Sequence, residues 1–187
     1  MSNPENAINY HKFVDEKLAE TGHRIVLITE DFLKSRLDDI MAHVNGIRTE
    51  YAKQYGWKPE SKEYFLNGLN NKWKYSFTIL NEKDGIRFLN FSSIYGDIIH
   101  NHCTYAHKDT RGLNFAKLHI IKLCQTGIDN GFTHQEGYWP KHNNGSIILF
   151  LKMGWQIEEI RNIADLFMKA DLMKVRNATY NLVLQGK

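Results

Sequence analysis

Two histidines, His100 and His102, stand two positions apart in a stretch that reads as a β-strand. Side chains two residues apart on a strand point to the same face of a sheet. Histidine changes its charge near neutral pH, so it can take a proton from an attacking nucleophile. Alternatively, both rings are hydrogen-bonded polar groups in the wall of a groove. Both interpretations stay open for His100, whereas the structural one is favoured for His102.

The same pair also suggests a zinc site, because Cys103 and His107 follow closely. Two histidines on one strand face can bind zinc. Cys103 and His107 are expected to point to the other face, so a full set of ligands does not converge and we expect no metal. The second cysteine, Cys124, is not spaced from Cys103 as in a zinc-binding or redox pair.

Downstream of the histidines, a basic loop leads from the predicted strand into a predicted amphipathic helix that ends near Asn130. The first N–H groups of a helix lack partners within the helix and attract anions. Arg111 adds a planar fork of donors, Gly112 leaves room for a phosphate, and Lys108 adds charge. The glycine-rich signatures of dinucleotide folds and P-loops are absent. The loop therefore predicts another kind of phosphate site, although a solvated arginine in a plain strand–loop–helix unit is the alternative.

Two blocks of the sequence resemble the acetyl-CoA-binding core of the GCN5-related N-acetyltransferases: DTRGLNFAKLHIIKLCQTGIDNGF and NNGSIILFLKMGW. That family begins its long helix with Arg/Gln-x-x-Gly-x-Gly/Ala. Here Arg111 takes the first position, Asn114 replaces the middle glycine, and Ala116 takes the last. The second block aligns through Asn143, Ser146-Ile147, Phe150 and Gly154-Trp155. The resemblance covers about the second half of the chain, and the first half matches only by the order of its elements.

The resemblance implies acetyl-CoA as co-substrate. Its pyrophosphate would bind the turn at the start of the long helix, made of Arg111, Gly112, Leu113, Asn114, Phe115 and Ala116. Its pantetheine arm would pair with the main chain of Thr104, Tyr105 and Ala106 and contact Asn143, with Phe150 nearby. The Cβ atom of Asn114 could crowd the pyrophosphate, or its amide could replace a lost donor.

Transfer to an amine needs a base, and the family often has a glutamate on the fourth strand for this purpose. The corresponding position here is about His100. The family's usual acid, a tyrosine on the short helix, corresponds to Phe150, which cannot donate a proton. The thiolate would then leave unaided, another group such as Tyr105 or Tyr138 would replace the acid, or amine transfer is lost. We assign His100, His102 and Tyr105 as the catalytic candidates.

The function implied by the resemblance is therefore direct transfer of an acetyl group to a primary amine. Two alternatives remain: a catalytically degenerate acyl-CoA-binding or interaction module, and an acyltransferase that uses a longer acyl-CoA or an acyl carrier protein. The acceptor is a small molecule or a peptide. Trp57 falls in a predicted loop where the family binds acceptors, and Glu136 either orients an amine or is exposed.

Composition suits this reading. The 187 residues are 42% hydrophobic and 24% charged, as expected for one globular domain, 1–187, with residues 1–22 as an extension of its core. A net charge of +3 is too small for a nucleic-acid partner, and no apolar run is long enough to span a membrane. Sparse cysteines favour a reducing cytoplasmic location. A homodimer that forms through the last strands is expected only by analogy with members of the family.

The resemblance implies a fold of the α/β (α+β) class: a mixed, mostly antiparallel sheet of six to seven strands, flanked by helices and splayed between strands 4 and 5. Hydrophobic periodicity predicts helices from residue 31 with Thr29 as cap, over 61–73 with Ser61 as cap, after Arg111 and over 143–153. It predicts strands over 24–29, 75–80, 86–94, 98–106, 134–139, 155–161 and 178–184. The connection over 163–175 is left unassigned.

Overall fold

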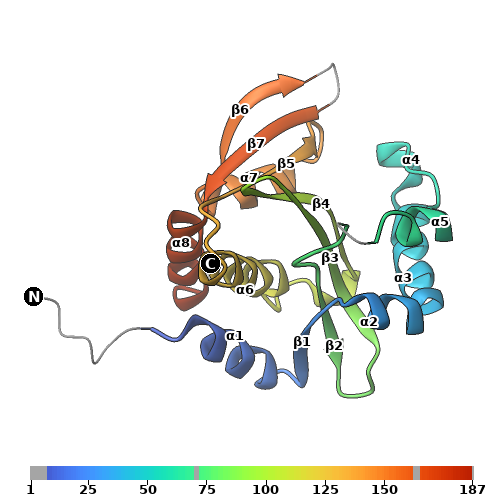
Figure 1. Cartoon of the computed structure of the whole chain (residues 1–187), viewed down its shortest axis with the longest axis horizontal. Coiled ribbons are helices and arrows are strands. Elements are labelled where there is room, and N and C mark those ends of the chain that lie inside the picture. Colours follow the sequence, from blue (N-terminus) through green and yellow to red (C-terminus); the bar gives the residue numbers. More distant parts are fainter. Residues whose placement is uncertain (1–7, 70–71, 162–164, 187) are drawn as a thin grey trace, which may run out of the picture.

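A seven-stranded sheet forms the middle layer of the computed structural model, which describes residues 8–69, 72–161 and 165–186 (Figure 1). The strands are β1 (His23–Leu27), β2 (Phe77–Asn81), β3 (Ile86–Tyr95), β4 (Ile98–Ala106), β5 (His134–Pro140), β6 (Gln156–Arg161) and β7 (Asp165–Asp171). Their order across the sheet is β1-β2-β3-β4-β5-β7-β6. Only the β4–β5 pair among them is parallel. The predicted mixed, mostly antiparallel sheet is confirmed.

The two parallel strands separate after a short pairing. Residues Ile98–Asn101 of β4 pair with His134–Gly137 of β5, and beyond these the strands diverge. Gly137 and Asn101 form the last pair before the strands separate. The two strands are very close at this point, because a Cβ atom on Gly137 would lie 2.9 Å from the carbonyl oxygen of Asn101. The predicted splay is therefore present, and we call the space between the diverging strands the slot.

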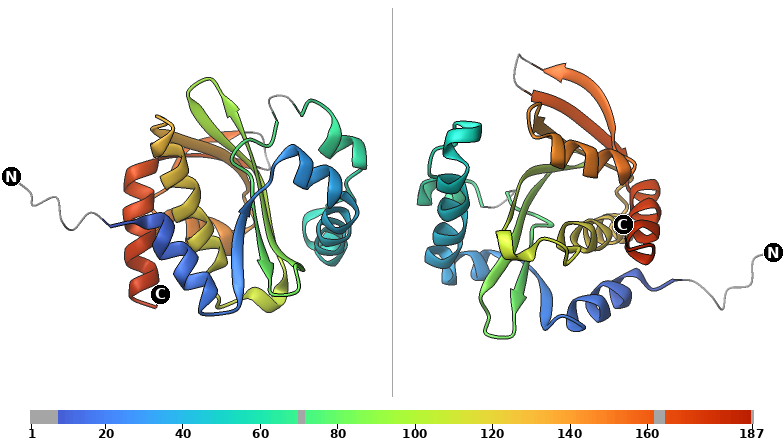
Figure 2. Two further views of the ribbon diagram at one scale, coloured as in Figure 1. Left: turned by 60° about the horizontal axis from the view of Figure 1, so that its bottom comes forward. Right: turned by 180° about the vertical axis from the view of Figure 1, so that it is seen from behind.

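Helices cover both faces of the sheet (Figure 2). One face carries α1 (Tyr10–Ala19), α6 (Phe115–Asp129), α7 (Asn144–Lys152) and α8 (Leu172–Leu184). The other carries α2 (Glu30–Ser35), α3 (Leu37–Glu50), α4 (Ala52–Tyr55) and α5 (Lys62–Leu66). Within the described residues, no helix has both the length and the apolar character that a membrane span needs.

Helix α6 is buried on most of its sides, which explains its nearly continuous apolar sequence. Leu123 and Cys124 face a core cluster shared with β5, α7 and α8, while Leu118 and Ile121 pack against Val14 and other residues near α1. Contacts also tie the flanking helices to it: Lys122 binds Asp15 of α1 at 2.9 Å, and Arg176 of α8 binds Gln125 at 2.6 Å. The helix that follows the Arg111 loop is thus fixed by packing on most of its sides.

The expected strand over 178–184 is wrong, because this stretch belongs to helix α8. Its β-branched and aromatic residues suggested a strand, but the buried residues Leu172, Val175 and Thr179 follow a helical spacing. Asp171 caps the helix by accepting a hydrogen bond from the Lys174 N–H group at 2.8 Å. Tertiary packing against α6 has overridden local β propensity.

Two other boundaries differ from expectation. The helix predicted over 61–73 starts at its Ser61 cap as expected but ends at Leu66. Further on, Trp73 and Tyr75 have φ angles of 61° and 59°, which a helix cannot contain. The unassigned connection over 163–175 holds strand β7, and its residues 163 and 164 lie outside the described residues.

Candidate functional site

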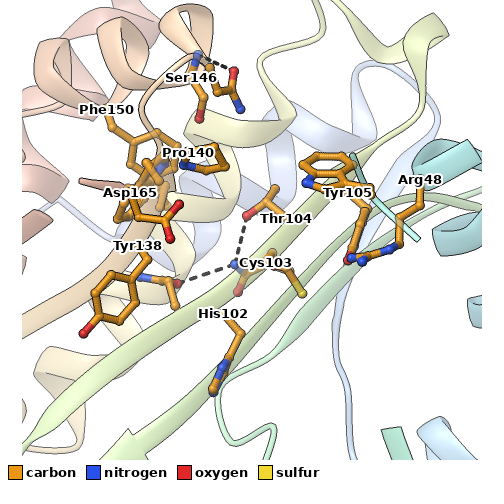
Figure 3. A pocket seen from close by; sticks show the side chains of 16 residues that line it. Arg48, His102, Cys103, Thr104, Tyr105, Tyr138, Pro140, Ser146, Phe150 and Asp165 are labelled. Carbon is orange, nitrogen blue, oxygen red and sulfur yellow. Dashed lines mark hydrogen bonds between the residues drawn. The ribbon is translucent and has the colours of Figure 1, made fainter. Parts of the chain in front are cut away.

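The slot forms a cavity of about 270 Å³ that is lined from both sides of the sheet (Figure 3). Five of the sequence-predicted site residues line it: His102, Thr104, Tyr105, Asn143 and Phe150. Unpredicted wall residues include Arg48, Asn90, Asn101, Trp139 and Asp165. The remaining predicted residues are not among the lining residues: His100 lies next to His102, and the others form the end of β4, the loop and the first residues of α6.

The β4 side of the slot offers main-chain atoms. Beyond Asn101, β4 continues to Ala106 with β3 on one side and no strand partner on the β5 side, among the described residues. Thr104 is exposed there, whereas the Tyr105 side chain is buried. A free strand edge of this kind can accept an extended, peptide-like ligand.

A β-bulge opposite Phe91 and Ser92 interrupts β4. Phe91 pairs with Cys103 and Ser92 with Asn101, so His102 is the extra residue. The bulge turns the Cys103 side chain towards a cluster that also contains Trp73, and Trp73 contacts the His102 ring at 5.2 Å. The expectation that Cys103 points to the face opposite His102 is therefore wrong. In the described parts of the chain, no group of three metal-binding side chains converges.

The loop between β4 and α6 begins with one turn of 3-10 helix, Lys108–Thr110. Gly112 and Asn114 then adopt left-handed φ angles of 87° and 59°. Asparagine tolerates this conformation better than most residues, which explains how it can replace glycine here. The Asn114 side chain caps no N–H group of α6 and instead accepts a hydrogen bond from Lys117 at 2.6 Å.

The start of α6 therefore offers main-chain donors rather than side chains. Phe115 is buried in the core, so only its backbone is placed to meet a ligand. The Arg111 guanidinium donates to the Tyr51 hydroxyl at 2.8 Å, which holds it near the end of α3. N–H groups without a side-chain cap, next to an exposed arginine, are the kind of groups that bind anions in proteins, so a phosphate site here stays a prediction.

His100 forms a pair with Glu136 on the neighbouring strand. The Nδ1 atom lies 3.1 Å from a Glu136 carboxylate oxygen, and both side chains are mostly buried. The His100 ring is 4.8 Å from that of His102 and 5.7 Å from that of Tyr138, and both of these residues line the slot. A carboxylate on Nδ1 fixes the ring orientation and leaves Nε2 to accept a proton.

His102 has a different environment. Its Nε2 atom is 2.8 Å from the Ser93 hydroxyl. Burial, with smaller effects from His100 and Lys72, lowers the pKa of His102 to about 4. It is therefore neutral at physiological pH, which suits a hydrogen-bonded wall residue.

An ionic network on the α3 side of the slot was not predicted. Arg48 pairs with Glu60 at 2.9 Å, donates to the Tyr105 hydroxyl at 3.0 Å and to the Lys58 carbonyl, and lies over the Trp57 ring. Burial raises the pKa of Tyr105 well above its usual value, so the hydroxyl keeps its proton. Helix, loop and strand supply these groups from distant positions, and only Trp57 and Tyr105 had a sequence signal.

Three aromatic residues beside the slot, Tyr51, Tyr55 and Trp57, are in mutual ring contact, and we call them the aromatic strap. Trp57 lines the slot and Tyr51 binds Arg111 on the β4 side. Tyr55 stacks on His142, which follows β5, with ring centroids 5.1 Å apart. The strap therefore contacts both sides of the slot.

The α7 side contributes Asn143 and Phe150. Asn143 caps α7 by accepting from the Ser146 N–H group at 3.3 Å. Phe150 packs on Trp139 at 4.7 Å and on Trp155 at 5.3 Å. Asn143 and Ser146 are polar, but at Phe150 this wall is apolar and holds no proton donor.

Several solved structures share this fold. The ribosomal-protein-S18-alanine N-acetyltransferase from Escherichia coli covers 80% of this chain and 94% of its own, with a TM-score of 0.64 and 12% identity. The PaiA N-acetyltransferase from Thermoplasma acidophilum, in complex with coenzyme A, covers 80% and 98%, with a TM-score of 0.67 and 13% identity. An N-acetyltransferase from Staphylococcus aureus Mu50 covers 80% and 98%, with a TM-score of 0.63 and 18% identity.

No protein-family model matches the sequence, and no curated protein does. The likeness to solved structures therefore lies in the fold. The chain has the fold of the GCN5-related N-acetyltransferases, as the two sequence blocks implied.

Proposed function

We propose that the protein is an N-acetyltransferase that moves an acetyl group from acetyl-CoA to a primary amine by direct attack. The observation that carries this proposal is the continuous path along β4. The free edge of β4 leads from the slot to the first turn of α6, whose N–H groups have no side-chain cap. One path thus offers strand-like hydrogen bonds followed by an anion site.

Acetyl-CoA would lie along this path with its pyrophosphate at the start of α6 and its thioester in the slot. Its pantetheine amides pair with the main chain of Thr104 to Ala106. Its pyrophosphate accepts from the N–H groups at the start of α6 and from Arg111, which then exchanges Tyr51 for phosphate. The thioester reaches the narrow end of the slot near Asn101 and Gly137. The Thermoplasma protein, solved with coenzyme A, supports a donor of this type.

The reaction balances as follows. The amine nitrogen attacks the thioester carbonyl carbon, the C–N bond forms, the C–S bond breaks, and coenzyme A leaves as thiolate. The amine proton goes to Nε2 of His100, whose Nδ1 donates to Glu136. The Tyr105 hydroxyl, which accepts from Arg48, is the group that we assign to protonate the thiolate; Tyr105 then regains a proton from water and His100 releases one to water, so both return to their starting states.

A specific observation favours a second candidate, a module that binds acyl-CoA without turnover. Phe150 stands in the slot wall where the family has its acid, and no hydroxyl replaces it there. This candidate predicts donor binding with no acetylated product.

The first experiment is a thermal-shift titration with acetyl-CoA, coenzyme A and octanoyl-CoA. A ligand that binds only the folded state raises the melting temperature. We expect a saturable shift with acetyl-CoA and coenzyme A. Absence of a shift with all three would refute the donor site. Mass spectrometry of a primary-amine panel incubated with acetyl-CoA then separates the two candidates, because the module would leave every amine unmodified.

A further inference from the structure

One charged group of the slot wall has no charged or hydrogen-bonding partner within the described part of the chain. Arg48 and Asp165 are the wall residues with a permanent charge at neutral pH. Arg48 is paired with Glu60, so its charge is balanced. The half-buried carboxylate of Asp165 has no hydrogen-bond or ion-pair partner among the residues that the structure describes. The slot therefore has an excess negative charge on its β5 side.

The strand register places Asp165 on the same face as the His100–Glu136 pair. Asp165 pairs with Pro140 across β5 and β7, and alternate residues of β5 share a face. Glu136, Tyr138 and Pro140 thus lie in one row. The His100–Glu136 pair lies at one end of this row, the Tyr138 ring lies in the middle, and the Asp165 carboxylate lies at the other end. The four residue-to-residue steps from Glu136 to Pro140 span roughly 13 Å of strand.

Among the described residues, the basic residue paired with Asp165 in the strand register forms no ion pair with it. Arg161 is its register partner on β6. The guanidinium of Arg161 instead donates to the Tyr138 hydroxyl at 2.5 Å and to Glu159 at 3.2 Å, and lies over the Phe167 ring. Asp165 is left to face the slot, as Figure 3 shows.

We infer that the acceptor is a small alkyl diamine whose second nitrogen binds Asp165 as an ammonium ion while the first attacks the thioester. This inference rests on the proposed function. A carboxylate beside the attacking nitrogen would hold it protonated and inert, whereas a remote carboxylate stabilises only the second charge. The alkyl chain lies along the Tyr138 ring. The aromatic strap on the other side of the slot limits the acceptor to a small molecule.

The test compares two probes of equal length, 1,5-diaminopentane and pentan-1-amine, by calorimetric titration with and without coenzyme A. We expect the parent protein to bind the diamine at least tenfold more tightly. Asp165→Asn should reduce this preference to less than twofold, and Asp165→Glu should retain most of it. Glu158→Gln is the matched control, because it removes one exposed β6 carboxylate outside the slot and should keep the full preference.

Equal binding of the two probes by the parent, absence of diamine binding, or a preference that survives Asp165→Asn would each overturn the inference. The acetyl-CoA thermal shift is measured on the same samples. It should be unchanged in Asp165→Asn. A parent that prefers the diamine but shows no shift with acetyl-CoA would retain the cation site and refute the donor instead, so the two failures are distinguishable.

Discussion

The proposed donor-binding region and the proposed acceptor-binding region use different kinds of chemical group. The proposed donor side uses main-chain groups of one continuous stretch, from Thr104 on β4 to the first turn of α6. The proposed acceptor side uses side chains that β4, β5 and β7 bring together: His100, Glu136, Tyr138 and Asp165. Main-chain donors depend on backbone shape and tolerate a change such as Asn114 for glycine. A side-chain site changes with each substitution, so it can set the acceptor without altering the donor.

The sharpest test of this division is His100→Ala. The loss of a general base is expected to lower kcat by about 10²- to 10⁴-fold while the acetyl-CoA thermal shift stays the same. Glu136→Gln should give a smaller loss, because the ring remains but its orientation is less fixed. Steady-state kinetics with an accepted amine provides the measurement. His134→Ala is the control, because His134 lies on the same face of β5 as Glu136. An equal loss of kcat in His134→Ala and in His100→Ala would remove His100 from the mechanism.

Arg111→Glu tests the donor side. We expect acetyl-CoA to bind on the order of 100-fold more weakly, because a charged hydrogen bond contributes about 1.5–3 kcal/mol and the new carboxylate repels the pyrophosphate. Titration calorimetry measures the change. Arg24→Glu reverses the same charge at an exposed pair with Asp84 and should bind like the parent. Unchanged donor affinity in Arg111→Glu would show that this loop is not the phosphate site.

Gly137→Ala tests the point where the two sides meet. Its Cβ atom would lie 2.9 Å from the Asn101 carbonyl oxygen and from the Trp139 ring, so we expect a loss of roughly 1–3 kcal/mol in the free energy of unfolding. Urea denaturation provides the value. Gly145→Ala, in α7, meets no atom within 4 Å and should be neutral or slightly stabilising. Equal stability of both variants would contradict the close approach.

The smallest expected effect concerns acid. Burial lowers the pKa of His102 and that of His43 to about 4 from an ordinary 6.5. The unfolded chain therefore binds more protons between these values. The free energy of unfolding is therefore highest above pH 6.5 and decreases as the pH falls towards 4. Each of the two rings contributes on the order of 1–2 kcal/mol to this decrease. Urea denaturation at pH 7.5 and pH 4.5 should show a smaller difference in His102→Gln than in the parent. Parallel pH profiles would contradict this.

Sequence patterns predicted most of the sheet because its signals are local. The β3–β4 pair appears at the expected positions, and β4 spans Ile98–Ala106 as predicted, because alternating residues and the Gly96-Asp97 turn mark it. The caps Thr29 and Ser61 were also found correctly, since each side chain acts within three residues. Helix α8 was missed because its register depends on packing against α6, which no local pattern encodes.

The candidate site divides in the same way. The Arg111 loop and Asn143 carried motifs, so the sequence was sufficient to name them. The Arg48–Glu60–Tyr105 network and the position of Asp165 depend on pairings between distant segments. The bulge at His102, which moves Cys103 to the same face, had no sequence signal either. Whether His100, Tyr105 and the residues of the loop act as proposed stays a prediction.

The packing of α1 and α8 has a kinetic consequence. The Tyr10 hydroxyl of α1 donates to Asn177 of α8 across a separation of 167 positions, and both helices pack on α6. Contacts with such a separation require closure of a long loop, so they form late and slow the folding reaction. During synthesis, α6 emerges well before α8 can cover it. The helix whose first turn would hold the donor phosphates therefore reaches its final packing only after α8 has been synthesised, and until then the apolar surface that α8 covers is exposed.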